Sequence, residues 1–415
     1  MLTELVRLKE HSTSSKFSDE ELLSILKSDN KLVENVDFNN NCFKTNYFIG
    51  VTWLADTETA LYVTPKLDEE SSRIDYFLML SKAFQHPEML EFSDDLFAMD
   101  FNAKPVKILQ NQDFITPFLV MTYLQTVYVI VKKGLKKDYY RRTSNLHGAV
   151  KGKILVSTTI KHNFTRNRTL DTYCSYDDYG TNNLENRILK KALKFSISYL
   201  KSIYSSDERI SGLMSFIYPA FKDIDDEASI AELQSPNKNP FFSEYRKGLH
   251  LAKILLKRFS YNLQNTDQSE ITEIQPFWIN MPRLFEFYVL GLLREHLGRN
   301  EIIFQSKASY GDLDYLRITA GKEMVIDAKY KKLYRDSSYD IDDIRQLSGY
   351  ARDIQTLNKT KIAGEIWRIS LLPCLIIYPD IKMPDWRNID MEITKNRIAQ
   401  FQNFFKLGVQ IPVIE

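Results

Sequence analysis

Two acidic residues and a lysine stand at the ends of two short apolar segments, and this feature constrains the fold of the chain most. Asp314 opens a predicted strand over 315–318, and a second predicted strand, 324–326, runs into Asp327-Ala328-Lys329. The four residues 319–322 between the strands suit a tight hairpin turn. Such a hairpin brings the start of one strand beside the end of the other, so we expect Asp314 and Asp327 to lie close together.

Two carboxylates at one strand end repel each other unless a cation neutralises them. Oxygen ligands with room for water suit Mg²⁺, with Mn²⁺ as an alternative. Lys329 lies two residues beyond Asp327 and emerges on the same face, where it can orient an attacking water and stabilise charge on a phosphoryl group. A surface hairpin with ordinary ion pairs would explain a lone Asp-x-Lys, but the full combination is much rarer. The pattern therefore predicts a metal-dependent hydrolytic site.

A third acid precedes the hairpin on a helix predicted over 283–297. Asn280-Met281-Pro282 is typical of a helix start, because proline lacks only an N–H that would be unpaired there. The helix is apolar nearly all round, so Glu286 must be paired, ligated or turned towards a wet cleft. Taken alone, a salt bridge to a neighbouring Arg or Lys is the simpler interpretation.

Downstream, the segment 343–350 predicts a helix on which Gln346 and Tyr350 share a face. By itself this pair fits a surface helix with one buried tyrosine. Residues 374–378 then predict an apolar strand that is buried on both faces.

A chain of 415 residues is too long for one ordinary core, so two or three domains are expected. The clearest linker is 264–269, which divides the chain into 1–268 and 269–415. In the first part, periodicity predicts two strands within 46–65, and helices over 72–86, 114 to about 142, 184–204 and 245–262, the last two separated by an irregular stretch.

Several classes of protein are disfavoured by the rest of the sequence. The formal net charge is +1 and the three cysteines lie far apart, which argues against a polycation, a cysteine zinc site and a disulfide framework. No HExxH is present, and the glycine-rich run 148–153 has too few residues between its glycines for a nucleotide-binding loop. The N-terminus has no signal-peptide pattern and no run suits a membrane span, so we expect a cytoplasmic protein. The basic run 132–142 fits either a helix C-terminus or a phosphate-binding surface.

These residues resemble the PD-(D/E)XK nuclease pattern, with Glu286 on a helix, Asp314 at a strand start and then Asp327-x-Lys329. Gln346-x-x-x-Tyr350 resembles the Q-x-x-x-Y motif of RecB-like nucleases. Leu313 stands where the pattern has proline, and Asp312 is a second candidate for the first acid. The resemblance implies that Asp314, Asp327 and Glu286 bind the metal, and that Lys329, Gln346 and Tyr350 complete the catalytic set.

More narrowly, residues from about 130 to 380 are similar to the McrC family, the nuclease subunits of modification-dependent restriction systems. The similarity lies in Phe285-Glu286, Ile326 to Lys331, Gln346-x-x-x-Tyr350, Gly148-x-x-Lys151-Gly152 and 186–190. It implies a partner, a hexameric McrB-like AAA+ GTPase, which recognises double-stranded DNA with or without modified cytosine. GTP would be used by that partner and not bound by this chain. The region 1–268 would bind the partner and stimulate its GTPase, and 269–415 would cleave.

Together, these patterns predict an α+β multidomain protein. It would have a β-rich N-terminal region, a helical middle and a C-terminal α/β nuclease domain built on a central mixed sheet. The leading hypothesis is the DNA endonuclease subunit of a two-component, nucleotide-dependent restriction system. A stand-alone repair or defence nuclease, and a catalytically inactive activator of an AAA+ partner, are the alternatives.

Overall fold

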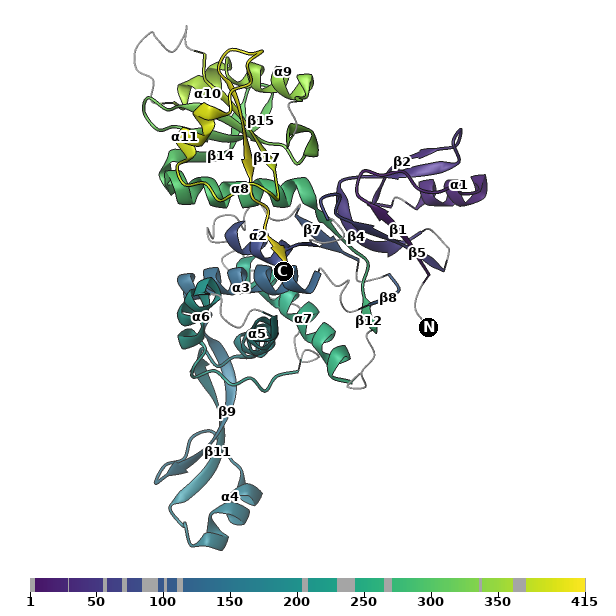
Figure 1. Cartoon of the computed structure of the whole chain (residues 1–415). Helices are drawn as coiled ribbons and strands as arrows, with labels where there is room; N and C mark the ends of the chain where they lie inside the picture. The colour runs from purple at the N-terminus through teal and green to yellow at the C-terminus, as the bar shows by residue number, and fades with distance from the viewer. Residues whose placement is uncertain are drawn as a thin grey trace. The chain divides into compact units, whose positions relative to one another are not determined.

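The computed structural model describes residues 4–28, 30–54, 58–68, 73–83, 96–100, 103–109, 115–203, 208–229, 243–264, 271–335, 338–360 and 371–414. The chain forms two compact units, one of residues 1–118 with 269–415 and the other of residues 119–268 (Figure 1). The elements are mixed helices and strands, as predicted for an α+β protein. The proposed division of roles between 1–268 and 269–415 stays a prediction.

The first unit contains an N-terminal five-stranded sheet with the order β1-β5-β4-β13-β7. The predicted strand pair within 46–65 is confirmed as the antiparallel hairpin β4–β5, and β1 lies parallel to β5. The strands of this sheet are β1 (Glu4–Lys9), β4 (Phe48–Trp53), β5 (Thr59–Thr64), β7 (Phe97–Met99) and β13 (Phe277–Asn280).

The first unit also contains smaller elements. Helix α1 (Asp19–Lys27) begins with a capping box between Ser18 and Glu21, and it buries Leu22 and Ile25 in a core shared with β5. The helix predicted over 72–86 is confirmed only for α2 (Tyr76–Ala83), because residues 73–74 form a strand instead, and residues 72 and 84–86 lie outside the described residues. The remaining strands are β2 (Val33–Asp37), β3 (Cys42–Thr45), β6 (Arg73–Ile74), β8 (Val106–Leu109), β12 (Ile271–Ile274) and β19 (Val413–Ile414).

Strand β13 joins the N-terminal sheet to the helix that carries Glu286. It lies between β4 and β7, and helix α8 (Met281–Leu297) follows it without a loop. Asn280 ends β13 and also caps α8, because its side chain accepts a hydrogen bond of 3.1 Å from the Arg283 N–H. The predicted start of this helix is thereby confirmed.

A second five-stranded sheet has the order β14-β15-β16-β17-β18. The first three strands are antiparallel and the last three parallel, so the sheet is mixed as predicted. Strand β17 is buried along its whole length, which confirms the apolar strand expected at 374–378. The strands are β14 (Ile302–Ala308), β15 (Gly311–Arg317), β16 (Met324–Ala328), β17 (Cys374–Pro379) and β18 (Phe404–Val409).

Helices α8 and α9 cover opposite faces of the mixed sheet. The Tyr315 hydroxyl donates to the Glu286 carbonyl oxygen of α8 at 2.7 Å, whereas Leu316 packs with Ile344 and Leu347 of α9. Neighbouring strand residues point to opposite faces, so the two helices lie on different sides. The further helices of this region are α9 (Ile341–Tyr350), α10 (Ile354–Asn358), α11 (Ile389–Lys395) and the 3₁₀ turns Arg299–Glu301 and Lys332–Arg335.

The second unit combines long helices with a three-stranded antiparallel sheet of order β10-β11-β9. Its helices α3 (Ile115–Lys133), α5 (Leu184–Ile203) and α7 (Ser243–Gln264) confirm three predicted helices, and α3 is buried through most of its length. In Figure 1, β9 and β11 run away from these helices and carry α4 at their far end. The other elements are α4 (Val156–His162), α6 (Glu208–Ala220), β9 (Asp138–His147), β10 (Lys153–Ile154), β11 (Asp171–Gly180) and the 3₁₀ turn Phe164–Arg166.

Two predictions about this unit were wrong. The helix expected to continue to about residue 142 ends at Lys133, because Gly134 adopts a φ of +95° and residues 138–147 pair with β11. The stretch between α5 and α7 was expected to be irregular but contains α6. In the described part of the chain, no helix is long and apolar enough to cross a membrane.

Candidate active site

Asp314 and Asp327 lie beside each other on neighbouring strands. The pairing of Tyr315 with Ile326 makes these two acids the next opposed positions along β15 and β16. Asp314 Oδ2 accepts a hydrogen bond of 2.9 Å from the Ala328 N–H, immediately after Asp327. Burial raises the pKa of Asp314 well above its ordinary value, and the charges of Asp327 and Glu286 raise it further. The hairpin thus concentrates negative charge at one point of the sheet.

Glu286 reaches this cluster from α8. Its carboxylate forms a 2.7 Å ion pair with Arg283, the neighbouring arginine that the simplest interpretation anticipated. Burial raises the pKa of Glu286, the Arg283 charge opposes that shift, and the charge of Asp327 adds to it. Glu286 is therefore both paired on its own helix and electrostatically coupled to Asp327.

Lys329 points back into the cluster. Its Nζ lies 2.7 Å from Asp327 Oδ2 and donates to Gln346 Oε1 at 2.9 Å. Burial lowers the pKa of Lys329, but the charges of Asp327, Asp343 and Asp314 outweigh burial and raise it above its ordinary value. The side chain is therefore an ammonium, which can donate hydrogen bonds and oppose negative charge but cannot accept a proton.

Of the two residues predicted on α9, only Gln346 reaches the cluster. Tyr350 is buried, and its hydroxyl donates to the Asp312 carbonyl oxygen at 3.2 Å instead. That contact holds the beginning of β15, the strand that carries Asp314. Asp312 itself is exposed and pairs across the strands with Lys307, so the geometry favours Asp314 as the acid facing Asp327.

Asp343 belongs to the same polar group but is not among the site residues predicted from the sequence. It is buried, lies 3.6 Å from Lys329 Nζ through Oδ1, and accepts two hydrogen bonds from Lys331 at 3.0 and 2.9 Å. The Tyr334 hydroxyl also donates to it. Its place in the site could have been predicted from the sequence, because Asp343 lies three residues before Gln346 on one helix and residues at that spacing share a face.

The chemistry of the donors fits a hard divalent cation. Asp314, Asp327 and Glu286 offer only carboxylate oxygens, which Mg²⁺ and Mn²⁺ prefer. Asp327 Oδ2 is buried and accepts no well-angled hydrogen bond among the described residues, although the Lys329 ammonium lies 2.7 Å away. In that same part of the chain, no three His, Cys, Asp or Glu side chains are already arranged around a metal position. Arg283 and the Ala328 N–H hold Glu286 and Asp314 instead.

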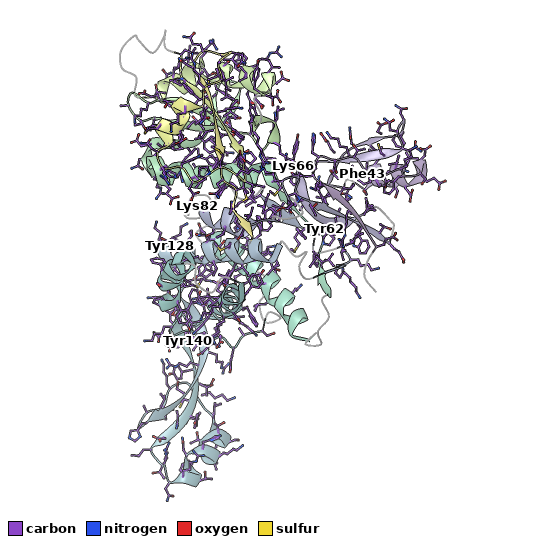
Figure 2. All side chains as sticks on the ribbon, viewed as in Figure 1. Phe43, Tyr62, Lys66, Lys82, Tyr128 and Tyr140 are labelled. Atoms are coloured by element: carbon purple, nitrogen blue, oxygen red, sulfur yellow. The ribbon has the colours of Figure 1, made fainter. Side chains whose placement is uncertain are left out.

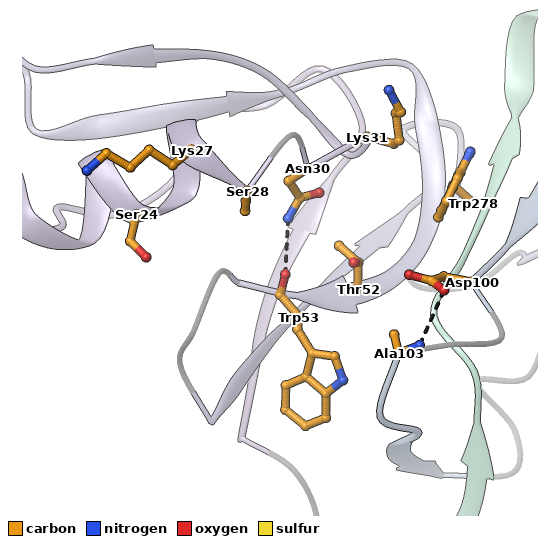
Figure 3. A pocket seen from close by; sticks show the side chains of 10 residues that line it. All are labelled: Ser24, Lys27, Ser28, Asn30, Lys31, Thr52, Trp53, Asp100, Ala103 and Trp278. Atoms are coloured by element: carbon orange, nitrogen blue, oxygen red, sulfur yellow. Dashed lines mark hydrogen bonds between the residues drawn. The ribbon is translucent and has the colours of Figure 1, made fainter.

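A cavity of about 420 Å³ lies elsewhere, in the N-terminal sheet (Figure 3). Trp53 and Trp278 line it, together with Lys27 and Asn30 from the end of α1 and the loop after it. Asn30 donates to the Trp53 carbonyl oxygen at 3.3 Å, which ties that loop to β4. None of the predicted site residues lines this cavity, so it is separate from the acidic cluster.

The fold and site define an α+β protein whose mixed sheet brings two carboxylates together on adjacent strands, with a lysine just beyond the end of one of them. A family model described as "McrBC 5-methylcytosine restriction system component" matches residues 43–362, and the chain belongs to this family. This confirms the resemblance to McrBC systems inferred from the sequence. No curated protein matches the chain.

Two solved structures from Thermococcus gammatolerans are similar to it. One is a refined half-complex from a tetradecameric assembly of McrB AAA+ hexamers with bound McrC. Its sequence identity to this chain is 16%, the match covers 98% of this chain and 94% of that chain, and the TM-score is 0.39. The other is the McrBC complex, 14% identical, with 71% and 88% covered and a TM-score of 0.27.

Proposed function

We propose that this protein is the DNA endonuclease subunit of a two-component, nucleotide-dependent restriction system. Its reaction would be Mg²⁺-dependent hydrolysis of DNA phosphodiester bonds at a PD-(D/E)XK site. The observation that carries the proposal is the meeting of Asp314 and Asp327 on adjacent strands, with the Lys329 ammonium 2.7 Å from Asp327. Membership of the McrBC family supports the biological setting.

The chemistry follows from the protonation states of the cluster. A bound Mg²⁺ would polarise the scissile phosphate and lower the pKa of its bound water. Asp314, Asp327 and Glu286 would hold that ion. Its charge would offset both the burial and the mutual repulsion that raise the pKa of Asp314 and Glu286. Lys329, held as an ammonium, would stabilise the negative charge that develops on the phosphoryl oxygens. Gln346 would orient Lys329 through the hydrogen bond to its ammonium.

The partner in this proposal is a hexameric McrB-like AAA+ GTPase, which recognises double-stranded DNA with or without modified cytosine. The family assignment supports it, and McrC is bound to McrB hexamers in one of the similar structures. Within 1–268, the small sheet of β9–β11 and α4 exposes large apolar side chains, which suits contact with another protein. Those more than half exposed include Tyr139, Val150, Val156, Ile160, Leu170 and Tyr179.

The test is cleavage of methylated and unmethylated plasmid in Mg²⁺, with and without a co-expressed AAA+ partner and GTP. Wild type should cut, and Asp327→Asn and Asp314→Asn should fall to background, whereas Asp312→Asn should keep its activity. Full cutting by Asp327→Asn would refute the assigned site. If Asp312→Asn lost cleavage activity and Asp314→Asn kept it, Asp312 would be the first acid of the pattern instead of Asp314.

The same experiment separates the two alternatives. Cleavage that needs neither partner nor GTP would favour a stand-alone nuclease. Equal inactivity of wild type and Asp327→Asn, with stimulation of the partner's GTPase intact, would favour an inactive activator.

A further inference from the structure

The N-terminal sheet reaches the candidate active site through two charged residues. Glu10 directly follows β1, and Lys66 lies two residues beyond β5. Because β1 and β5 are parallel neighbours, their C-terminal ends lie at the same end of the sheet, and Glu10 and Lys66 follow those ends. The Glu10 N–H donates to the Thr64 carbonyl oxygen at 2.8 Å. Figure 2 labels Lys66 where this sheet meets α8.

Both residues hold Tyr330, the residue after Lys329. The Tyr330 hydroxyl donates to Glu10 Oε1 at 2.9 Å, and the Lys66 N–H donates to the same oxygen at 3.0 Å. Lys66 Nζ donates to the Tyr330 carbonyl oxygen at 2.7 Å and lies 4.3 Å from the centre of the Tyr330 ring. Glu10 and Tyr330 are only 1% and 4% exposed, so water does not compete for these contacts. The side chain and the backbone of Tyr330 are thus both fixed from the N-terminal sheet.

These contacts determine where the backbone of Lys329 lies. On one side, the Lys329 N–H donates to the Ile377 carbonyl oxygen of β17 at 2.8 Å. On the other, the Lys331 N–H donates to the Lys329 carbonyl oxygen at 2.7 Å, which closes a tight turn centred on Tyr330. Strand β17 therefore anchors the chain before the turn, and Lys66 anchors its centre.

Ionisable side chains are a costly way to attach one sheet to another where they are shielded from water, because their charged forms lose hydration. Burial accordingly raises the pKa of Glu10 to about 7 and lowers the pKa of Lys66. An apolar contact would attach the sheets at lower cost, but it would not fix the direction of the Tyr330 carbonyl group. Hydrogen bonds from an ammonium do fix it, since they depend on angle as well as distance.

We propose that Lys66, held by Glu10, is a positioning residue that keeps Lys329 directed at Asp327 and Gln346. This inference deepens the proposed nuclease function and rests on it. The N-terminal sheet would then help to position an active-site residue, in addition to its structural role in the first unit.

The test uses the full chain with Lys66→Met, Lys66→Arg and the control Lys191→Met. Lys191 also donates from its ammonium to a backbone carbonyl oxygen, that of Ala228 at 2.9 Å, in the other unit. Lys66→Met should lower kcat for plasmid cleavage by about 10- to 100-fold with KM unchanged, as for other residues that orient a catalytic group. Lys66→Arg should recover most of kcat, and Lys191→Met should match wild type.

A second readout does not depend on activity. Acetylation of Lys329 by acetic anhydride at one fixed pH, followed by mass spectrometry, should be faster in Lys66→Met, because the amine leaves its acidic neighbours. Unchanged kcat together with unchanged acetylation of Lys329 would overturn the inference. If Lys66→Met does not fold, Tyr330→Phe removes only the hydroxyl contact to Glu10 and is judged by the same two measurements.

The two readouts also separate failure of the inference from failure of the proposed function. Wild type that cuts no better than Asp327→Asn would sink the nuclease assignment, and with it a role in catalysis for Lys66. Normal cleavage by wild type with no effect of Lys66→Met on either readout would sink the positioning role alone.

Discussion

The buried carboxyl group of Glu10 makes the stability of the protein depend on pH in a calculable way. In the variant Glu10→Gln, the amide keeps the oxygen that accepts from Tyr330 and from the Lys66 N–H, but it cannot ionise. In the fold, burial raises the pKa of Glu10 from 4.5 to about 7, with the Lys66 charge opposing the shift. An acid with a raised pKa favours the folded state while it is protonated. That contribution is lost as pH rises from about 4.5 through about 7.

The size of the effect follows from that difference in pKa. Between pH 5 and pH 9, ionisation of Glu10 should lower the free energy of unfolding by about 2–3 kcal/mol. For a unit of this size the loss corresponds to roughly 5–10 °C in Tm. Glu10→Gln should lack this component, so its Tm should rise relative to that of wild type as pH increases.

The assay is thermal unfolding of wild type, Glu10→Gln and Glu4→Gln at pH 5, 7 and 9, followed by circular dichroism. Glu4 lies on the same strand, β1, but is exposed, so its variant should track wild type at every pH. A difference in Tm between Glu10→Gln and wild type that is the same at pH 5 and pH 9 would refute the reasoning. In that case the carboxyl group would either be hydrated or remain in one protonation state throughout.

Three further predictions concern the acidic cluster. Gln346→Ala should lower kcat about fivefold at unchanged KM in steady-state cleavage, since an exposed hydrogen bond to an ammonium contributes about 1 kcal/mol. A change in KM alone would instead assign Gln346 to DNA binding. Asp314→Asn should raise Tm at pH 8 without Mg²⁺, because the pKa of Asp314 is raised and its charged form costs stability above about pH 4. Equal Tm values for the variant and the wild type would contradict this. Mg²⁺ at ten times its Kd should stabilise wild type by about 1.4 kcal/mol and leave the Tm of Asp327→Asn unchanged; an equal shift in both would place the ion elsewhere.

The local part of the site was predictable from the sequence. The turn residues 319–322, the two apolar strands and the alternation of side chains along a strand sufficed to bring Asp314 to Asp327 and to direct Lys329 to the same place. The cap at Asn280 was likewise visible as a local pattern. In each case the contacts join residues close together in the chain, so spacing alone determines them.

Contacts between distant segments were not predictable. The pairing of β13 with β4 and β7 joins residues on either side of the whole second unit, and no local pattern specifies such a partner. The same holds for Tyr330 and Glu10. Strand β9 was taken for the end of a helix because its partner β11 lies far along the chain, and cross-strand pairing outweighed local propensity.

Strand β13 is synthesised long after β4 and β7, the strands with which it pairs, and this order affects folding during synthesis. The N-terminal sheet places β13 between β4 and β7, so it cannot close until the ribosome has released residues 277–280. At about 5–20 residues per second, translation of the intervening segment takes on the order of tens of seconds. During that time β4 presents an unpaired edge, the kind of surface that pairs with other chains. The nascent protein should therefore depend on chaperones most strongly just before α8 emerges.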